Sequence, residues 1–290
     1  MPLLRDLLPD LGRRTLVMGV LNVTPDSFSD GGQFLDPDQA VDHARRMQHE
    51  GADILDIGGE STRPGAPPVS ADEEIARIVP VISRLREQVS LPLSLDTTKS
   101  LVARAGAAAG AHIINDISGG TMDEGMLAVV SSLNVPLVLM HLPVKPQQMG
   151  WSQSAQTGGM DPEVDVIDAV TAFLVGRVKA AEAAGISREN LVIDPGFGFG
   201  KSVEQNLTLL RRLSEIKRRV GNDLPLLLGT SRNSTIARVL GPFSDAEDPQ
   251  RVAGTAATVT LGIVQGADIV RVHDVGFMKR VTTVSDAVMR

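Results

Sequence analysis

Short apolar runs alternate with longer amphipathic stretches along most of the chain. The short runs are almost continuously hydrophobic, which is typical of strands covered on both faces by helices. They predict eight strands, at Thr15–Asn22, Asp53–Gly58, Pro92–Asp96, His112–Asp116, Pro136–His141, Leu191–Asp194, Pro225–Gly229 and Asp268–His273. The amphipathic stretches predict helices at Pro37–Glu50, Ala71–Gln88, Lys99–Gly110, Asp123–Ser132, Pro162–Gly185, Val203–Val220, Gln250–Gln265 and Gly276–Met289.

Four of these helices end on the similar sequences EGAD, AGAH, AGIS and QGAD. Each contains a glycine where a helix stops, because glycine adopts the left-handed conformation of a helix C-terminus without a steric penalty. Eight such strand–helix units predict the α/β class and a single (β/α)₈ TIM barrel spanning residues 1–290, since the competing doubly wound sheet does not need eight units. Residues 1–14 precede the first strand and are expected to cover the bottom of the barrel.

The composition of the chain argues against several classes of function. The chain has 290 residues and a net charge of −7, with 3% aromatic residues, no cysteine and no tyrosine. An acidic chain with few aromatics argues against a nucleic-acid partner, which needs a basic face or stacking side chains. Without cysteine there is no disulfide, thiolate nucleophile or cysteine-ligated metal. No apolar run reaches 18 residues, so we expect no membrane partner and a cytoplasmic enzyme, or a mitochondrial one if the chain is part of a eukaryotic multifunctional protein.

Polar residues stand at the carboxyl end of every predicted strand. In (β/α)₈ barrels these ends form the active site. A single such residue is as well explained by a turn or a helix cap, but eight strands ending this way indicate one polar mouth. The residues are Asn22, Glu60–Arg63, Asp96, Asn115 with Asp116, His141, Asp194, Ser231–Ser234, and Arg271 with His273.

The types of these residues suggest three tasks. Asn22 and Asp96 offer oxygen ligands, too few to enclose a metal but suited to Mg²⁺ that keeps its waters and shares a substrate phosphate. Arg63, Arg271 and His273 can bind anionic oxygens. Asn115 and Asp194 present the acceptor and donor groups that recognise a flat, nitrogen-rich ring. The alternatives are structural: Asp194 as a turn residue before Pro195, and Asp96 as the cap of the next helix.

The segment DPGFGFGK, residues 194–201, is rich in glycine but lacks the spacing of a phosphate-binding P-loop. We expect Gly196, Gly198 and Gly200 to let the backbone approach a planar ligand, with Phe197 or Phe199 as a wall.

Two long motifs, GVLNVTPDSFSDGG (residues 19–32) and DIGGESTRPGA (residues 56–66), strongly resemble dihydropteroate synthase. The resemblance continues in order through SLDTTKS, INDISGG, VLMH, IDPGFGFGK, GTSRNS and VRVHDV, and so covers nearly the whole chain. It implies a transferase of folate biosynthesis, a target of sulfonamides. Such an enzyme joins p-aminobenzoate to 6-hydroxymethyl-7,8-dihydropterin diphosphate and releases diphosphate. It also implies a homodimer formed through barrel helices.

The resemblance assigns roles to individual residues. It implies a pterin site of Asp96, Asn115, Met140, Asp194, Phe199, Gly229, Asn233 and Arg271. It implies a p-aminobenzoate site of Phe28, Thr62, Arg63, Pro64 and Ser234, closed by the loops at residues 24–32 and 62–65. Asn22, Thr62, Arg271 and His273 would bind the diphosphate, with Mg²⁺ on Asn22. The catalytic groups would be Arg63, Asp96, Asp194, Arg271 and His273.

The chain departs from the family pattern in two places. Asn233 stands where the family motif has lysine, and the loss of a charged donor from a partly buried site is worth roughly 1.5–3 kcal/mol, or ~10–150-fold in a rate. The loop after the fifth strand, residues 143–160, is also altered, and Lys145 in it could replace the lost charge, although lysines in surface loops are usually solvated. Two alternatives follow: a pterin-binding paralogue with little activity, and a methyltetrahydrofolate-dependent methyltransferase. The two long loop motifs disfavour the methyltransferase, which has no p-aminobenzoate to enclose.

Overall fold

Eight parallel strands form one sheet in the computed structural model, which describes residues 3–23, 37–61, 66–144, 159–161, 163–241 and 248–290. Their order is β6-β5-β4-β3-β2-β1-β8-β7, and a parallel bridge between Ile193 and Leu226 joins the two ends into a barrel. The predicted (β/α)₈ TIM barrel is therefore confirmed. The strands are β1 (Leu16–Asn22), β2 (Ile54–Gly58), β3 (Leu93–Asp96), β4 (Ile113–Asp116), β5 (Leu137–Met140), β6 (Leu191–Asp194), β7 (Leu227–Leu228) and β8 (Ile269–Val272).

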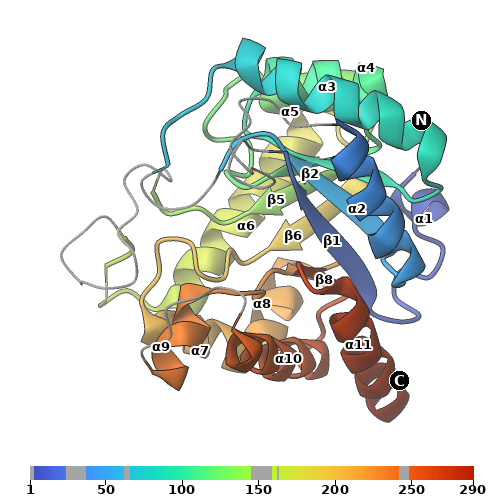
Figure 1. The fold of residues 1–290 in the computed structure, drawn as a ribbon. Coiled ribbons are helices and arrows are strands. Elements are labelled where there is room, and N and C mark those ends of the chain that lie inside the picture. Colours follow the sequence, from blue (N-terminus) through green and yellow to red (C-terminus); the bar gives the residue numbers. More distant parts are fainter. Residues whose placement is uncertain (1–2, 24–36, 62–65, 145–158, 162, 242–247) are drawn as a thin grey trace.

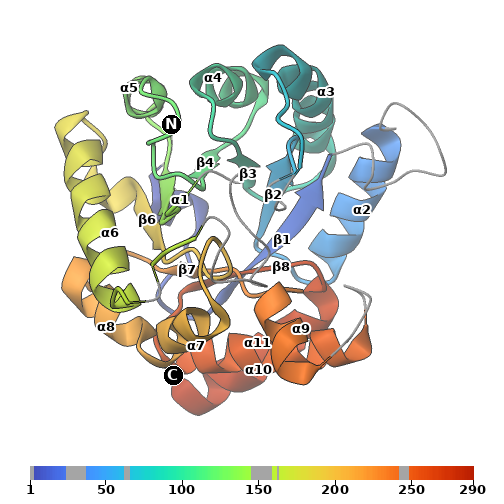
Figure 2. The ribbon, with the colours of Figure 1, turned by 90° about the vertical axis from the view of Figure 1, so that its left-hand side faces the viewer.

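Helices surround the strands as an outer ring, seen most clearly in Figure 2. The predicted helix at residues 203–220 is wrong as a single element, because the chain leaves helical geometry at Arg212 and forms two helices. A seven-residue helix, too short for a periodic pattern, follows the seventh strand. The helices are α1 (Leu4–Leu7), α2 (Pro37–His49), α3 (Ala71–Gln88), α4 (Ser100–Ala109), α5 (Met126–Leu133), α6 (Val166–Ala183), α7 (Val203–Arg211), α8 (Leu213–Val220), α9 (Ser234–Leu240), α10 (Pro249–Val264) and α11 (Val275–Met289), with a 3₁₀ turn at Arg188–Asn190.

Glycine ends the four helices that share a terminal sequence. The φ angles of Gly51, Gly110, Gly185 and Gly266 are 97°, 123°, 94° and 94°, all in the range that side chains disfavour. The sequence prediction of these helix ends is confirmed. None of the described helices is both long and apolar enough to cross a bilayer.

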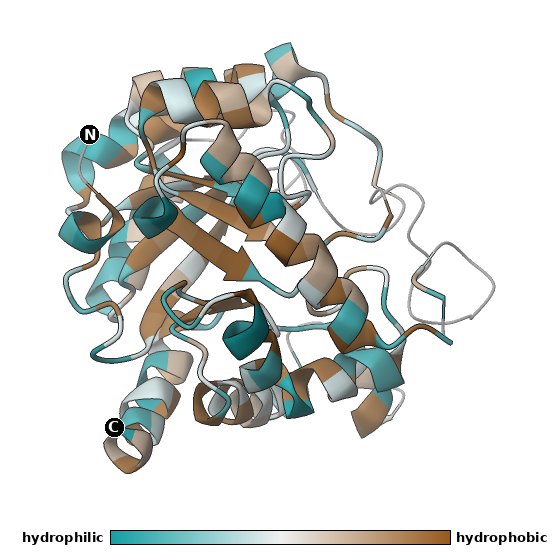
Figure 3. Cartoon of the chain, turned by 180° about the vertical axis from the view of Figure 1, so that it is seen from behind, coloured by the Kyte–Doolittle hydropathy of each residue, from teal (hydrophilic) through white to brown (hydrophobic). Residues whose placement is uncertain are grey.

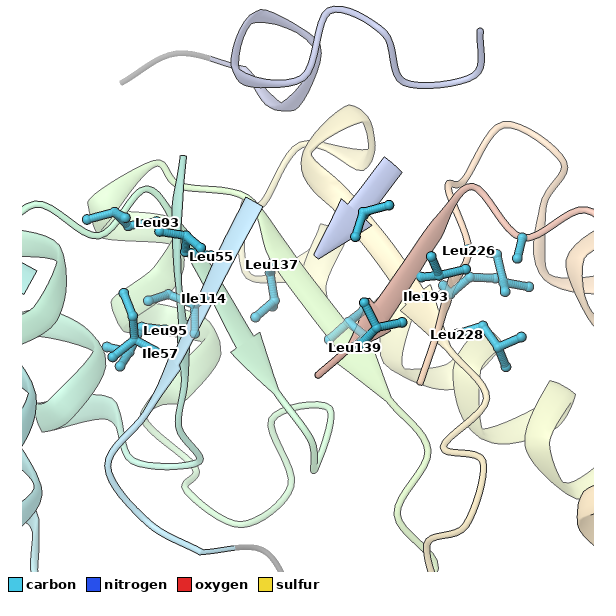
Figure 4. Packing of buried hydrophobic residues seen from close by; sticks show 14 of the residues in the cluster. Leu55, Ile57, Leu93, Leu95, Ile114, Leu137, Leu139, Ile193, Leu226 and Leu228 are labelled. Atoms are coloured by element: carbon cyan, nitrogen blue, oxygen red, sulfur yellow. The ribbon is translucent and has the colours of Figure 1, made fainter. Parts of the chain in front are cut away.

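Alternate residues of each strand face opposite sides of the barrel wall. The strands are predominantly hydrophobic along their length (Figure 3). Outward-facing side chains such as Leu55, Ile57 and Leu95 belong to the large core cluster under the helices (Figure 4). Inward-facing side chains form a second cluster in the lower half of the barrel, which Leu4, Leu8 and Leu11 of the N-terminal segment join. The strand members of this inner cluster are Leu16, Met18, Ile54, Ile113, Val138, Val192, Leu227 and Ile269.

Candidate active site

The inward-facing positions change from apolar to polar at the carboxyl ends of the strands. Every second side chain of a strand lies on the same face, so the residue two positions after a member of the inner apolar cluster also faces inward. On β2, β4, β6 and β8 these next side chains are Asp56, Asn115, Asp194 and Arg271. Asp96, Met140 and Gly229 occupy the corresponding positions of β3, β5 and the end of β7, whereas on β1 Val20 pairs with Asp56 and Asn22 lies two residues further along the strand. Alternate strands contribute to successive layers of such a barrel. Together, these inward-facing side chains form the polar upper layer of the barrel interior.

Arg271 is the centre of this layer. Its Nε donates to Oδ2 of Asp56 at 2.6 Å, and its Nη2 donates to Oδ2 of Asp96 at 2.9 Å. The side-chain amide of Asn115 also donates to Oδ2 of Asp56, at 3.0 Å. One guanidinium therefore holds two carboxylates from neighbouring strands in fixed positions, with an amide as a third partner.

Sequence reasoning missed Asp56 as a site residue. The side chain is fully buried, and its Oδ1 has no hydrogen-bond partner among the described residues. A buried carboxylate oxygen without a hydrogen-bond partner destabilises the fold, and it indicates either a strained group or one whose partner is a bound ligand. The sequence did contain a signal for it, because Asp56 is the one charged residue in the buried strand ILDIG and packing alone does not explain a carboxylate there.

Burial sets the ionisation of this cluster. It raises the pKa of Asp96 to about 7, although Arg271 opposes the rise and Asp56 adds to it. Burial alone would lower the pKa of Arg271, but Asp56 and Asp96 outweigh this effect and raise it. Arg271 therefore remains charged, while Asp96 exchanges a proton near neutral pH.

Asp194 faces the same interior from β6 and is 6% exposed. Its Oδ1 accepts the backbone N–H of Gly196 at 2.7 Å. Burial raises the pKa of Asp194 to about 6, against that hydrogen bond and the positive charges of Lys201 and Arg271. Met140 pairs with Asp194 across the β5–β6 register and packs with Ile117, Leu142 and Phe199 as an apolar wall.

The glycine-rich segment after β6 has positive φ angles at all three predicted glycines. A Cβ on Gly196 would lie 2.1 Å from the carbonyl oxygen of His141, and one on Gly198 would lie 1.9 Å from Nδ2 of Asn233. At these two positions the close approach that requires glycine is to protein atoms. Phe197 lies in the outer core at 1% exposure, which leaves Phe199 as the wall residue.

The seventh and eighth strand ends form a polar rim. Oγ of Ser231 accepts the backbone N–H of His273 at 3.1 Å and contacts its ring Nδ1 at 3.0 Å, which fixes the imidazole. Asn233 caps α9, because its Oδ1 accepts the N–H of Thr235 at 2.9 Å, and Ser234 is the first residue of that helix.

Three other strand-end residues serve structure. The carboxylate of Asp116 accepts from Ser118 and Gly120 and shapes the loop after β4. The ring of His141 packs edge-on against Phe173 at 5.0 Å, and burial lowers its pKa to about 2. Glu60 pairs with Lys99. Asp116 and His141 each follow an inward-facing residue and so face the helices, a distinction that alternation along the strands predicts.

Several predicted site residues lie outside the described residues: Phe28, Thr62, Arg63, Pro64 and Lys145, together with the loop segments 24–32 and 62–65 and most of 143–160. Among the described residues the structure brings together Asp96, Asn115, Met140, Asp194, Gly229 and Arg271, and the Cβ position of Gly229 lies 3.8 Å from Cβ of Arg271. Phe199, Asn233, His273 and Asn22 belong to the loops and strand ends around them.

A barrel with this charged inner layer is a small-molecule enzyme of the (β/α)₈ class. Comparison with known proteins makes this specific: residues 18–273 match the family of pterin binding enzymes. The chain is 47% identical to the dihydropteroate synthase of Synechocystis, over 97% of this chain and 92% of that protein. Two solved structures cover 95% of the chain. They are Xanthomonas albilineans dihydropteroate synthase with 4-aminobenzoic acid (46% identity, TM-score 0.83, 93% of that chain) and the Yersinia pestis enzyme with a sulfonamide drug complex (41%, 0.84, 94%).

The chain belongs to the pterin-binding enzyme family, in its dihydropteroate synthase branch, and is therefore a transferase.

Proposed function

We propose that this chain condenses 6-hydroxymethyl-7,8-dihydropterin diphosphate with p-aminobenzoate, giving 7,8-dihydropteroate and diphosphate. The observation that supports it most strongly is the layer formed by Asp56, Asp96, Asn115, Asp194 and Arg271, which offers carboxylate, amide and guanidinium groups to one buried ring. The methyltransferase alternative is disfavoured by the relatives, which are synthases.

The pterin would lie against this layer. Asp194 would accept N–H groups of the ring, and the amide oxygen of Asn115 would accept another, because its nitrogen already donates to Asp56. Met140 and Phe199 would pack against the flat face. In the reaction the arylamine nitrogen bonds to the methylene carbon while the C–O bond to diphosphate breaks. If that cleavage leads, Asp96 and Asp194 stabilise the cationic carbon electrostatically.

Diphosphate would leave toward the polar rim at His273 and Asn22. The leaving group takes the C–O bonding electrons, so its new charge needs donors and cations nearby. The arylamine is already nucleophilic and needs no strong base, and its proton can pass to water or to diphosphate. Arg271, which holds Asp56 and Asp96, would lie between the pterin and the diphosphate and donate charged hydrogen bonds to both.

Magnesium is part of this proposal. The Oδ1 of Asn22 and the carboxylate of Asp96 both lie within 4 Å of the position that a Cβ on Gly58 would occupy. Amide and carboxylate oxygens suit Mg²⁺ that keeps several waters and binds substrate phosphate. Such an ion would supply positive charge to the leaving diphosphate.

p-Aminobenzoate is proposed to bind at the rim beside α9, with Ser234 near its carboxylate and Phe28, Thr62, Arg63 and Pro64 around it. Support comes from the relatives, one of which was solved with 4-aminobenzoic acid and another with a sulfonamide complex. Sulfonamides are thus expected to compete with p-aminobenzoate here. The cytoplasmic location expected from the sequence stays a prediction.

The test is a turnover assay with purified protein, both substrates and Mg²⁺, following diphosphate release and identifying dihydropteroate by mass. Product is expected only when all components are present, and chelation of Mg²⁺ is expected to slow its formation. Tight pterin binding without product would instead support the inactive paralogue.

Replacing Asn233 by Lys is expected to raise turnover by roughly 10-fold or more, since a charged donor in a partly buried site contributes ~1.5–3 kcal/mol. The same change removes the cap of α9, which costs about 1 kcal/mol of stability. Asn233→Met is the matched control, because it loses the cap and gains length without charge. Equal turnover in all three chains would mean that the site functions fully around Asn233.

The homodimer is proposed to form through α10 and α11. Exposed apolar residues concentrate there, including Val284 and Val288, which are 66% and 78% exposed. Phe277, Val284 and Val288 are spaced so that they share one face of α11, and Leu261 and Val264 extend the surface onto the neighbouring α10. An apolar face of this kind on two adjacent helices fits a second copy of the chain.

The double variant Val284→Asp/Val288→Asp is therefore expected to be monomeric by light scattering, where the unaltered chain is dimeric. Leu101, exposed on α4, supplies the control: Leu101→Asp should stay dimeric. An unaltered chain that is monomeric at micromolar concentration would contradict the proposed dimer.

A further inference from the structure

Lys201 is a buried cation next to the proposed pterin site. It ends the glycine-rich segment between β6 and α7 and is only 4% exposed. Its Nζ donates to three backbone carbonyl oxygens, those of Gly196 at 2.7 Å, Phe199 at 3.2 Å and His141 at 3.4 Å. An ammonium group has three N–H donors, so these carbonyls use all of them.

These contacts connect two strand ends. Gly196 and Phe199 belong to the loop after β6, whereas His141 directly follows β5. Residue 196 must be glycine for this arrangement, because a Cβ there would lie 2.1 Å from the carbonyl oxygen of His141 and 3.2 Å from Nζ of Lys201. The ammonium group thus fixes the turn whose first N–H, that of Gly196, donates to Asp194.

The titratable and charged groups around Lys201 and Asp194 come from four strands. Burial lowers the pKa of Lys201 to about 7. The negative charge of Asp194 on β6 opposes this fall and keeps it from being larger. His141 after β5 stays neutral, since burial lowers its pKa to about 2. Arg271 on β8 and Asp56 on β2 act on Asp194 in opposite directions. Lys201 is therefore one of two cations that favour the charged form of Asp194.

We propose that Lys201 is a positioning residue for pterin: its ammonium group locks the turn after β6 to the end of β5 and holds Asp194 in place as a charged acceptor. This rests on the proposed function, in which Asp194 accepts N–H groups of the pterin ring. Lys201 itself need not touch the substrate, because its three donors are engaged by carbonyls.

Lys201→Met tests the proposal through the pH dependence of pterin affinity, measured by calorimetry with 6-hydroxymethylpterin from pH 5.5 to 8.5. In the unaltered chain affinity should fall as the pH drops through about 6, when Asp194 takes up a proton. Without the Lys201 charge this midpoint should move up by roughly one unit, which lowers affinity about 5-fold at pH 6 and about 2-fold at pH 7. The KM for p-aminobenzoate should not change.

Two further variants separate this role from general stability. Lys201→Arg retains the charge and should keep the midpoint of the unaltered chain. Lys217→Met removes a half-buried lysine that pairs with Asp268 at the opposite end of the barrel, and it should lower thermal stability without moving the midpoint. If the Lys201→Met chain does not fold, Lys201→Gln, which keeps amide donors but no charge, takes its place.

An unchanged midpoint and pterin affinity in a folded Lys201→Met or Lys201→Gln chain would overturn the proposal. So would a midpoint shift of the same size in Lys217→Met. Failure of the proposed function looks different, because the unaltered chain would then neither bind 6-hydroxymethylpterin nor form dihydropteroate.

Discussion

Arg271→Met is expected to reduce kcat/KM by at least ~10³-fold, which corresponds to ~4 kcal/mol of transition-state stabilisation. Arg271 is the cation that holds both Asp56 and Asp96, and all three groups are largely buried. Removing one partner of a buried ion pair costs about 3–5 kcal/mol, because the remaining charges stay in the interior uncompensated. The pKa of Asp96, about 7 with Arg271 in place, should rise further, so that Asp96 is protonated at neutral pH.

A matched ion pair at the other end of the barrel provides the control. Arg14 holds Asp53 through two hydrogen bonds of 2.9 and 2.6 Å. Arg14→Met should lower the melting temperature and leave kcat/KM unchanged, whereas Arg271→Met should lower both. Steady-state kinetics and thermal unfolding on the two variants measure this contrast. Full turnover in Arg271→Met would show that the central layer is structural only.

Asp194→Asn should weaken pterin binding by roughly 100-fold, since a charged acceptor contributes ~1.5–3 kcal/mol to a buried hydrogen bond. The substitution keeps the size of the side chain and an oxygen for the N–H of Gly196. It removes the charge and replaces one acceptor with a donor, which then faces the ring N–H groups. Calorimetry with 6-hydroxymethylpterin at pH 8, where Asp194 is ionised, gives the largest contrast.

Asp116→Asn is the natural comparison for Asp194→Asn. Asp116 is a fully buried carboxylate of a nearby strand whose pKa burial also raises to about 6, but its oxygens accept from Ser118 and Gly120. Its variant should lose stability and retain pterin affinity. Equal loss of affinity in the two variants would show that binding follows barrel stability rather than the position of Asp194.

The barrel was readable from the sequence because its signals are local. Runs of apolar residues mark strands buried on both faces, and Gly51, Gly110, Gly185 and Gly266 mark helix ends by a conformation that few other residues adopt. The break at Arg212 and the seven-residue helix α9 were not predicted, because a short helix has too few turns to give a periodic pattern.

Site residues at strand ends could be predicted from the sequence. Their position at the end of a strand identified Asp96, Asn115, Asp194 and Arg271. The same criterion also selected Asp116 and His141, whose side chains face outward. Register along each strand separates the two groups, and it would also have found Asp56, which lies two residues before the strand end. Lys201 could not be found this way, because its role depends on carbonyl groups that only the folded loop brings together.

A crystal structure of the chain with 7,8-dihydropteroate bound would show directly whether the inner end of the barrel binds the pterin ring. One product molecule is expected in the upper half of the barrel, with Asp96, Asn115 and Asp194 hydrogen-bonded to the edges of the pterin ring. Met140 and Phe199 should lie against its face, and the aminobenzoate end should point toward Ser234 on α9. A pterin ring bound elsewhere, or bound in the barrel without contact to Asp194 and Asn115, would contradict the proposed pterin site.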